Sequence, residues 1–426
     1  MTQRTILAWL TIGLAALLSA CHDGKADTPQ PEKARRTVLV YMAGENDLSV
    51  NVTSDLDEMK QASRQLGDDD RLVVFVDRAN SAELPYIARV QNGEEQVVHR
   101  FSEDFYSSDP ERLTSIVGMV DSLFPAETYG LILWGHATGW VVVSDSVPQS
   151  AGAPLTRQTA HAPRHAYGKD TGSNTTTSFQ SRWMNITQMR RALQPLSRRL
   201  FIMADCCCMM SAEVAYELRE QCRYLIGSPA EVPADGAPYH LVVPHLFSQK
   251  TDFYRDIVDA YYDYYLQRLG SEDPTLSGHS LPLSVVDMDQ MESLAQATST
   301  IVMPRSRIST DSLAYYFRID MPVMHDMGNY AYTHILPADK ARYTAWRQAL
   351  DRAVVYRRFS ARWTTAYVRL MYDFDTFATF TEDSYAGLSM FLPRPEYSFS
   401  SVYDYNGGFR QLQWYDAAGC ASFIDF

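Results

Sequence analysis

Apolar and polar positions in the first half of the chain follow two periods, and each period predicts a different element. Short β-branched and apolar runs, typical of strands buried on both faces, occupy residues 36–44, 70–78, 129–140, 198–206 and 223–231. Residues 48–67 and 108–124 carry apolar side chains at helical spacing, the first with a cap near Ser49 or Asn51. Strands that alternate with helices predict a parallel sheet covered on both faces.

Three further features complete this pattern. Asn92-Gly93 between two alternating runs predicts a β-hairpin. Residues 144–181 are rich in Pro, Gly, Ser and Thr and predict a surface loop. The second half shows helical runs at 251–269, 291–303 and 338–360 and strand-like runs at 281–288 and 385–393. Since no linker separates the halves, we predict an α/β extension over 251–426, packed on a core over 37–250.

The N-terminal residues predict export. The apolar run at 6–18 has the length of a signal-peptide core and is short for a membrane span. It ends in Leu-Ser-Ala-Cys21, which is similar to a bacterial lipobox, where Cys21 would carry the lipid after cleavage. An ordinary secretory signal is the alternative. We therefore expect a signal peptide at 1–20, a tether at 21–36, and a lipid-anchored, extracytoplasmic protein of the cell envelope, at the outer membrane or cell surface.

The net charge of −13 excludes nucleic acid as an expected partner. With 46% hydrophobic residues, the rest of the chain has an ordinary globular composition, and we expect a monomer.

Candidate chemistry gathers at two predicted strand ends. Cys206, Cys207 and Cys208 follow the fourth strand, and His136 follows the strand before it. Because the carboxyl ends of parallel strands meet at one edge, we expect the two segments to be neighbours. A helix N-terminus favours a thiolate, and a nearby histidine can act as base and then protonate a leaving amine. The residues alone leave open which cysteine is the nucleophile, and the others would be small packing residues.

Other uses of the triplet are disfavoured. Tetrahedral zinc needs separated ligand pairs, and redox exchange usually needs two cysteines with two residues between them. Adjacent cysteines rarely form a disulfide with each other. We therefore assign no metal ligand, and a Cys/His pair requires no cofactor.

Several motifs in order resemble the clostripain family of cysteine peptidases, which has a caspase-like fold. They are VLVYMAGENDLS at 38–49, WGHATGW at 134–140, DCCCMMSAEVAYEL at 205–218, IGSPAEVPADGAPY at 226–239, HDMGNYA at 325–331 and GLSMFLP at 387–393. The resemblance covers most of the chain. It implies a caspase-like α/β fold, with a parallel-core sheet flanked by helices, and an endopeptidase activity.

The resemblance also implies residue roles. The family pattern has Asp, a small residue and then the nucleophile, which assigns Cys207, and it makes His136 the catalytic histidine. The backbone amides of Ala137 and Cys207 would bind the oxyanion. The family usually has Gly where this chain has Ala137, and Ala would be strained there if the position needs a positive φ.

Specificity and maturation are implied in the same way. The family typically cleaves after Arg or Lys, so Asp205 and Asp235 would line the primary pocket; a helix cap and a turn residue are the structural alternatives. Substrates would then be Arg- or Lys-containing proteins or peptides. Self-cleavage would fall in the 144–182 loop, whose candidate residues are Arg157, Arg164, Lys169 and Arg182.

Two expectations stay open at this level. Some relatives respond to calcium, but no calcium-loop pattern occurs here, so no ligands are assigned. The alternative from another functional class is a non-catalytic surface lipoprotein that binds peptides or glycans on a peptidase-like scaffold.

Overall fold

The computed structural model describes residues 33–80, 82–141, 166–172, 174–176, 181–272, 279–310, 312–318, 322–368, 371–373, 377–398 and 404–423. Internal contacts separate Met1–Lys33 from Ala34–Phe426, and every element below belongs to the second unit. The predicted boundary at residue 250 therefore stays a proposal about two parts of one compact unit.

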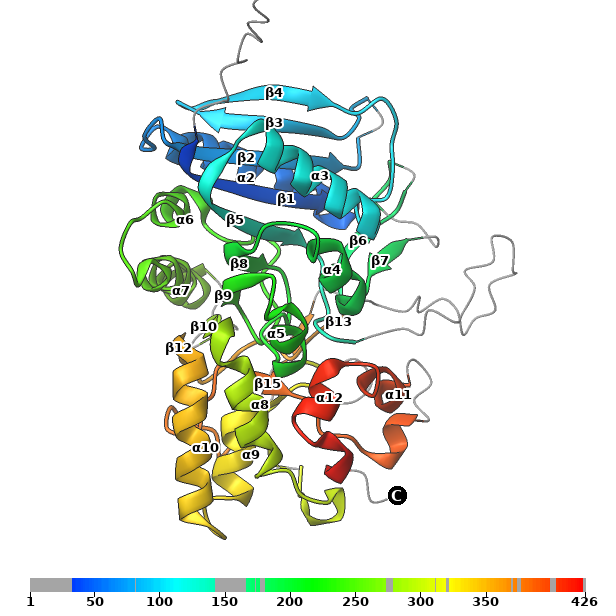
Figure 1. Ribbon diagram of the computed structural model, residues 1–426, viewed down its shortest axis with the longest axis vertical. Helices are drawn as coiled ribbons and strands as arrows, with labels where there is room; N and C mark the ends of the chain where they lie inside the picture. The colour runs from blue at the N-terminus through cyan, green and yellow to red at the C-terminus, as the bar shows by residue number, and fades with distance from the viewer. Residues whose placement is uncertain are drawn as a thin grey trace, which may run out of the picture. The chain divides into compact units, whose positions relative to one another are not determined.

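A nine-stranded sheet forms the centre of this unit (Figure 1). Its order is β12-β10-β9-β8-β5-β1-β2-β3-β4. The strands are β1 Ala34–Gly44, β2 Asp70–Arg78, β3 Tyr86–Gln91, β4 Glu94–Arg100, β5 Ala126–Gly135, β8 Arg199–Asp205, β9 Cys222–Gly227, β10 Leu283–Asp287 and β12 Val354–Arg358. The five central strands β2, β1, β5, β8 and β9 run parallel, and antiparallel strands extend both edges. The predicted parallel core is confirmed.

Smaller strand pairs and helices complete the unit. The pairs are β6 Tyr167–Asp170 with β7 Arg182–Met184, β11 His325–Asp326 with β15 Ser389–Met390, and β13 Ala366–Val368 with β14 Met371–Asp373. The α-helices are α2 Asn51–Ser63, α3 Pro110–Leu123, α4 Ile186–Leu193, α5 Ala212–Leu218, α6 Tyr239–Leu246, α7 Phe253–Glu272, α8 Met291–Ser299, α9 Met327–His334, α10 Lys340–Ala353, α11 Tyr405–Phe409 and α12 Gln413–Ala417. The 3-10 helices are η1 Asp47–Val50, η4 Met288–Gln290, η5 Arg305–Arg307, η6 Pro395–Ser398 and η7 Cys420–Phe423.

Alternate residues of β1 enter two different apolar cores, one on each face of the sheet. Val38 and Val40 pack with side chains of α2, α6 and α7, whereas Leu39 and Tyr41 pack with those of α3, α4 and α5. This is the period of two that a strand imposes, and it explains why the strand is apolar on both faces. Helices α8, α9 and α10 lie beyond the β10–β12 edge of the sheet (Figure 1).

One predicted element is wrong in part. The helix expected over 338–360 ends at Ala353, and the next residues form β12, which pairs antiparallel with β10. Val354 and Val355 are β-branched and fit a strand better than a helix. The segment therefore extends the central sheet instead of lengthening α10. Within the described residues, the helices are all too short or too polar to cross a membrane.

Candidate active site

The predicted site lies at the carboxyl ends of β5 and β8. These strands are parallel neighbours, and Trp134 of β5 pairs with Asp205 of β8. His136 and Cys207 each follow two residues after this last pair. Since neighbouring strands lie ~4.8 Å apart, the register brings the histidine loop and the cysteine loop to the same edge.

The two loops also pack closely beyond the strands. Gly139 has a φ of +68°, and a Cβ at this position would lie 2.5 Å from the carbonyl oxygen of Cys208. Only glycine therefore permits this approach of the two backbones.

His136 is oriented by a carboxylate that sequence reasoning missed. Its Nε2 lies 3.1 Å from Asp47 Oδ1. Asp47 begins η1, three residues after the end of β1, the strand beside β5. A hydrogen bond to a carboxylate needs the proton on Nε2, so a neutral imidazole carries its lone pair on Nδ1. Acid and base chemistry by His136 would then use Nδ1.

Asp47 is itself held by two partners. Lys169 Nζ lies 2.7 Å from the same oxygen that meets His136. Burial raises the pKa of Asp47, but the hydrogen bonds and charges of His136 and Lys169 outweigh it and hold the pKa well below its ordinary range. The carboxylate therefore stays ionised at neutral pH. Its position three residues after β1, at the same sheet edge as His136, was the signal available in the sequence.

The three adjacent cysteines have different surroundings. Cys206 and Cys208 are fully buried, and burial raises the pKa of both thiols well above their ordinary value. Of the five described cysteines, all free thiols, Cys207 is the one that is partly exposed. Its Sγ accepts a hydrogen bond from the backbone N–H of Val232 at 3.3 Å. As a thiol, the same sulfur donates to the carbonyl of Val232 at 3.8 Å, so the backbone of Val232 holds the side chain of Cys207 in place.

The expected helix N-terminus is not at Cys207. Helix α5 begins at Ala212, and its N-cap is Ser211, whose hydroxyl accepts from the N–H of Val214 at 3.2 Å. The triplet instead lies in a turn in which Cys208 has a φ of +62°. The N-cap of α5 therefore lies four residues after Cys207, which is too far along the chain for the helix dipole to act on the Cys207 thiol directly.

Ala137 is free of the strain that the sequence suggested. The described non-glycine residues with positive φ are Asn92, Asn174 and Cys208. Ala137 faces Tyr167 in a short antiparallel bridge whose hydrogen bonds are made by the residues on either side. The N–H of Ala137 therefore makes no hydrogen bond within this bridge, as an oxyanion donor would require.

Asp205 is a buried carboxylate that accepts three hydrogen bonds. Only 4% of it is exposed, and its carboxylate accepts from the hydroxyls of Tyr239 at 2.7 Å and Tyr261 at 2.8 Å and from the N–H of Ala237 at 3.1 Å. Burial raises its pKa, while these three hydrogen bonds act to lower it. Asp205 therefore helps to hold residues 236–239 beside the cysteine loop. It does not act as a helix N-cap.

Asp235 has the opposite surroundings. Its side chain is 55% exposed, and its carboxylate lies 3.3 Å from Arg268 Nη2 and 3.4 Å from Asn51 Nδ2. Gly236 separates it from the Asp205 carboxylate, since a Cβ on Gly236 would lie 2.9 Å from Asp205 Oδ2. The two acids thus sit on either side of one tight turn, one buried and one facing solvent.

The candidate cleavage residues divide into two groups. Lys169 lies in β6 and pairs with Asp47, and Arg182 begins β7 with its guanidinium 4.1 Å from the ring centre of Tyr106. Arg157 and Arg164 lie outside the described residues, as does Cys21.

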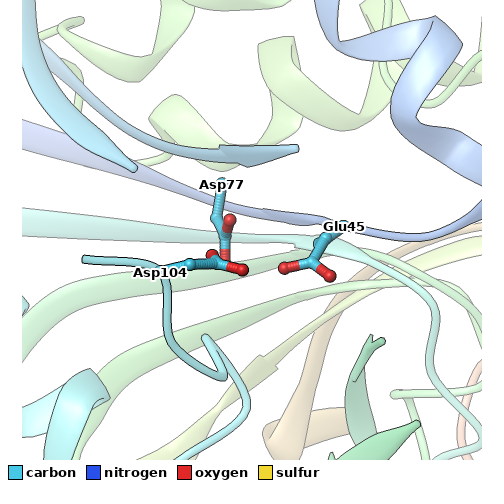
Figure 2. A group of neighbouring side chains, drawn as sticks. All are labelled: Glu45, Asp77 and Asp104. Atoms are coloured by element: carbon cyan, nitrogen blue, oxygen red, sulfur yellow. The ribbon is translucent and has the colours of Figure 1, made fainter. Parts of the chain in front are cut away.

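A second group of acids lies on the β1 side of this edge. Glu45, Asp77 and Asp104 each offer an oxygen, and the three oxygens lie within 4.8 Å of one another (Figure 2). The sequence analysis assigned no metal ligand. Acids at the ends of the adjacent strands β1 and β2 were the signal that could have pointed to one.

Comparisons with known proteins concern the family and the fold of the chain. The model of the clostripain family matches residues 40–425. A secreted C11 cysteine protease from Bacteroides thetaiotaomicron, solved with an irreversible peptide inhibitor, is 25% identical, with a TM-score of 0.74 over 91% of this chain and 100% of that one. An inactive zymogen C11 protease from Parabacteroides distasonis is 24% identical, with a TM-score of 0.71 over 91% of this chain and 99% of that one, and is similar in fold. No curated protein matched the chain.

Proposed function

The chain belongs to the clostripain family of cysteine proteases, and we propose that Cys207 is its nucleophile and His136 its general acid and base. The observation that carries the assignment is the exposure of the triplet: Cys207 reaches solvent, while its two neighbours are buried thiols with raised pKa values. The hydrogen bond from Val232 to Sγ and the strand register of Trp134 with Asp205 support it.

The proposed reaction is acyl transfer to the cysteine and then to water. The Cys207 thiolate attacks the carbonyl carbon of the scissile bond, and the N–H groups of Ala137 and Cys207 stabilise the oxyanion. His136 gives its Nδ1 proton to the leaving amine, which leaves a thioester. Nδ1 then accepts a proton from water, whose oxygen attacks the thioester. The C–S bond breaks, which returns the Cys207 thiolate and releases the carboxylic acid. Asp47 accepts a hydrogen bond from Nε2 and so keeps the imidazole in the tautomer that these reaction steps need.

We propose cleavage after Arg and, less readily, Lys, with Asp235 as the carboxylate that meets the substrate side chain. Asp235 is exposed and already attracts a guanidinium of this chain, that of Arg268. A carboxylate engaged by a guanidinium within its own protein has the chemistry to bind one from a substrate. Asp205, whose oxygens are occupied by three donors, would shape the wall behind it.

Self-processing is proposed at Arg157 or Arg164 in the 144–182 loop. Lys169 and Arg182 are poorer candidates because they lie in paired strands, and proteolysis needs a segment that can leave such pairing. Attachment to the cell envelope through a lipid on Cys21 is likewise a proposal. It is compatible with a relative described as secreted.

One feature of the sequence favours the alternative of a non-catalytic binding protein, namely that Ala137 stands where the family usually has Gly. Ala137 is not among the described residues with positive φ, so this departure brings no backbone strain.

An Arg-directed electrophilic probe tests the proposal directly. We expect it to label the parent chain on a tryptic peptide that contains Cys207, and to label neither Cys207→Ala nor His136→Asn. Labelling of Cys207→Ala at Cys206 or Cys208 would contradict the assignment.

A further inference from the structure

We propose that Glu45, Asp77 and Asp104 form a binding site for one calcium ion. The three side chains come from three separate segments: Glu45 follows β1, Asp77 lies in β2, and Asp104 follows β4. Figure 2 shows their carboxylates directed toward one another.

The geometry fits a calcium ion. The three oxygens lie within 4.8 Å of one another. Oxygens this close can meet one cation, since each Ca–O bond is about 2.3–2.6 Å. Magnesium usually keeps several waters and is held by one or two carboxylates, so a group of three carboxylates favours calcium. An all-oxygen set of carboxylates suits a hard cation and not zinc or copper.

A second observation comes from Asp77. Only 1% of this residue is exposed, and its Oδ2 is buried without a hydrogen-bond donor among the described residues. The hydroxyl of Ser107 lies within reach of the Asp77 carboxylate, but it donates to Asp170 Oδ2 at 2.7 Å and leaves Asp77 Oδ2 without a donor in the part of the chain that the structure describes. A buried carboxylate oxygen that lacks a donor is costly unless a cation meets it.

The surrounding charge points the same way. Three other acidic side chains, those of Asp170, Glu45 and Asp104, act on the Asp77 carboxylate with the same negative charge. Asp104 is only partly buried, so the group opens to solvent on one side. That opening would admit the ion together with the water molecules that complete its six to eight ligands.

A bound ion would also fasten the segment around β6 to the sheet. Glu45 accepts hydrogen bonds from the Thr171 hydroxyl and from the N–H of Asn174. In the same turn, Asn46 Nδ2 donates to the carbonyl of Lys169 at 2.7 Å. Neutralising the acids would therefore strengthen a junction that already joins the end of β1 to Lys169, Thr171 and Asn174.

Calorimetry with calcium chloride and thermal melts in calcium or EDTA test the site in a Cys207→Ala background of the mature chain. This background makes the result independent of the proposed catalytic role. We expect one ion per chain, a melting temperature raised by calcium, and weaker binding of magnesium. Asp77→Asn should weaken calcium binding more than tenfold, yet melt at or above its parent in EDTA because it removes repulsion.

Glu103→Gln is the matched control. It removes one charge next to Asp104, and its side chain is 73% exposed and pairs with Arg112. This variant should bind calcium as its parent does. Absence of binding in the parent, or equal loss in Asp77→Asn and Glu103→Gln, would overturn the proposal.

Discussion

The β8 side and the β1 side of the sheet's carboxyl edge hold their carboxylates in different ways. Asp205, at the end of β8, is buried and accepts hydrogen bonds from three neutral donors. Asp47, just after β1, is 55% exposed and meets a histidine and a lysine. Buried hydrogen bonds fix geometry because water cannot replace them, whereas exposed ion pairs contribute little to stability but can orient a side chain.

The contrast implies an order of effects. Substitutions on the β8 side should strongly lower turnover or stability, because they remove the nucleophile or break a buried hydrogen-bond network. Changes at Asp47 should reduce turnover moderately and leave the fold intact.

The largest effect is expected at Cys207. Cys207→Ala removes the nucleophile and should lower kcat by about three orders of magnitude or more, with no loss of stability. Cys206→Ala and Cys208→Ala delete buried sulfurs and should lower the melting temperature while retaining most of the activity per folded molecule. Steady-state kinetics and thermal melts on the three variants separate these outcomes. Equal activity losses in all three would mean that the triplet acts as a packing unit.

The next largest effect is expected at Asp205. Asp205→Asn replaces one acceptor oxygen by a donor facing Tyr239 or Tyr261, which should cost about 3 kcal/mol of unfolding free energy. Denaturant unfolding of the Cys207→Ala background measures this cost. Asp235→Asn is the matched control and should stay within about 0.5 kcal/mol of its parent, because the residue is exposed. A similar cost for both would remove the distinction between buried and exposed acids.

The period of the apolar residues was enough to predict the sheet and the edge that carries the site. Val38 to Gly44 can only be buried on both faces, and His136 and the triplet follow strands of the same parallel set. The choice of Cys207, in contrast, came from the resemblance. The physical basis of that choice is the burial of Cys206 and Cys208. This burial depends on tertiary packing, which three identical neighbouring residues in a sequence do not reveal.

The parts that escaped prediction depend on contacts distant in sequence. Asp47 meets His136 across 89 positions, and Asp77 meets Glu45 only because β1 and β2 are neighbours. The end of α10 was missed because apolar residues continue past Ala353, and only the open edge of β10 makes a strand there favourable. The helix N-terminus expected at Cys207 was displaced because Ser211 supplies a better cap.

Substrate selectivity should change through Asp235. Asp235→Asn should lower kcat/KM for an Arg peptide by about tenfold to a hundredfold, because one charge-assisted pair is lost, and leave a Gln peptide unaffected. Arg268→Met removes the internal partner of Asp235 and should leave Arg cleavage equal or faster. Parallel assays on the two peptides measure the ratio. An unchanged Arg-to-Gln ratio in Asp235→Asn would show that another group recognises the substrate.

The smallest effect is expected at Asp47, and it tests the comparison from the β1 side. Asp47→Asn keeps an acceptor oxygen near His136 but removes the charge, so kcat should fall about tenfold while KM and the melting temperature change little. Lys169→Met removes the other partner of Asp47 and should lower kcat less, because the hydrogen bond between His136 and the Asp47 carboxylate remains. Full activity in Asp47→Asn would mean that the carboxylate does not position the imidazole. A lowered melting temperature comparable to that of Asp205→Asn would mean that the exposed side of the edge is as important to folding as the buried one.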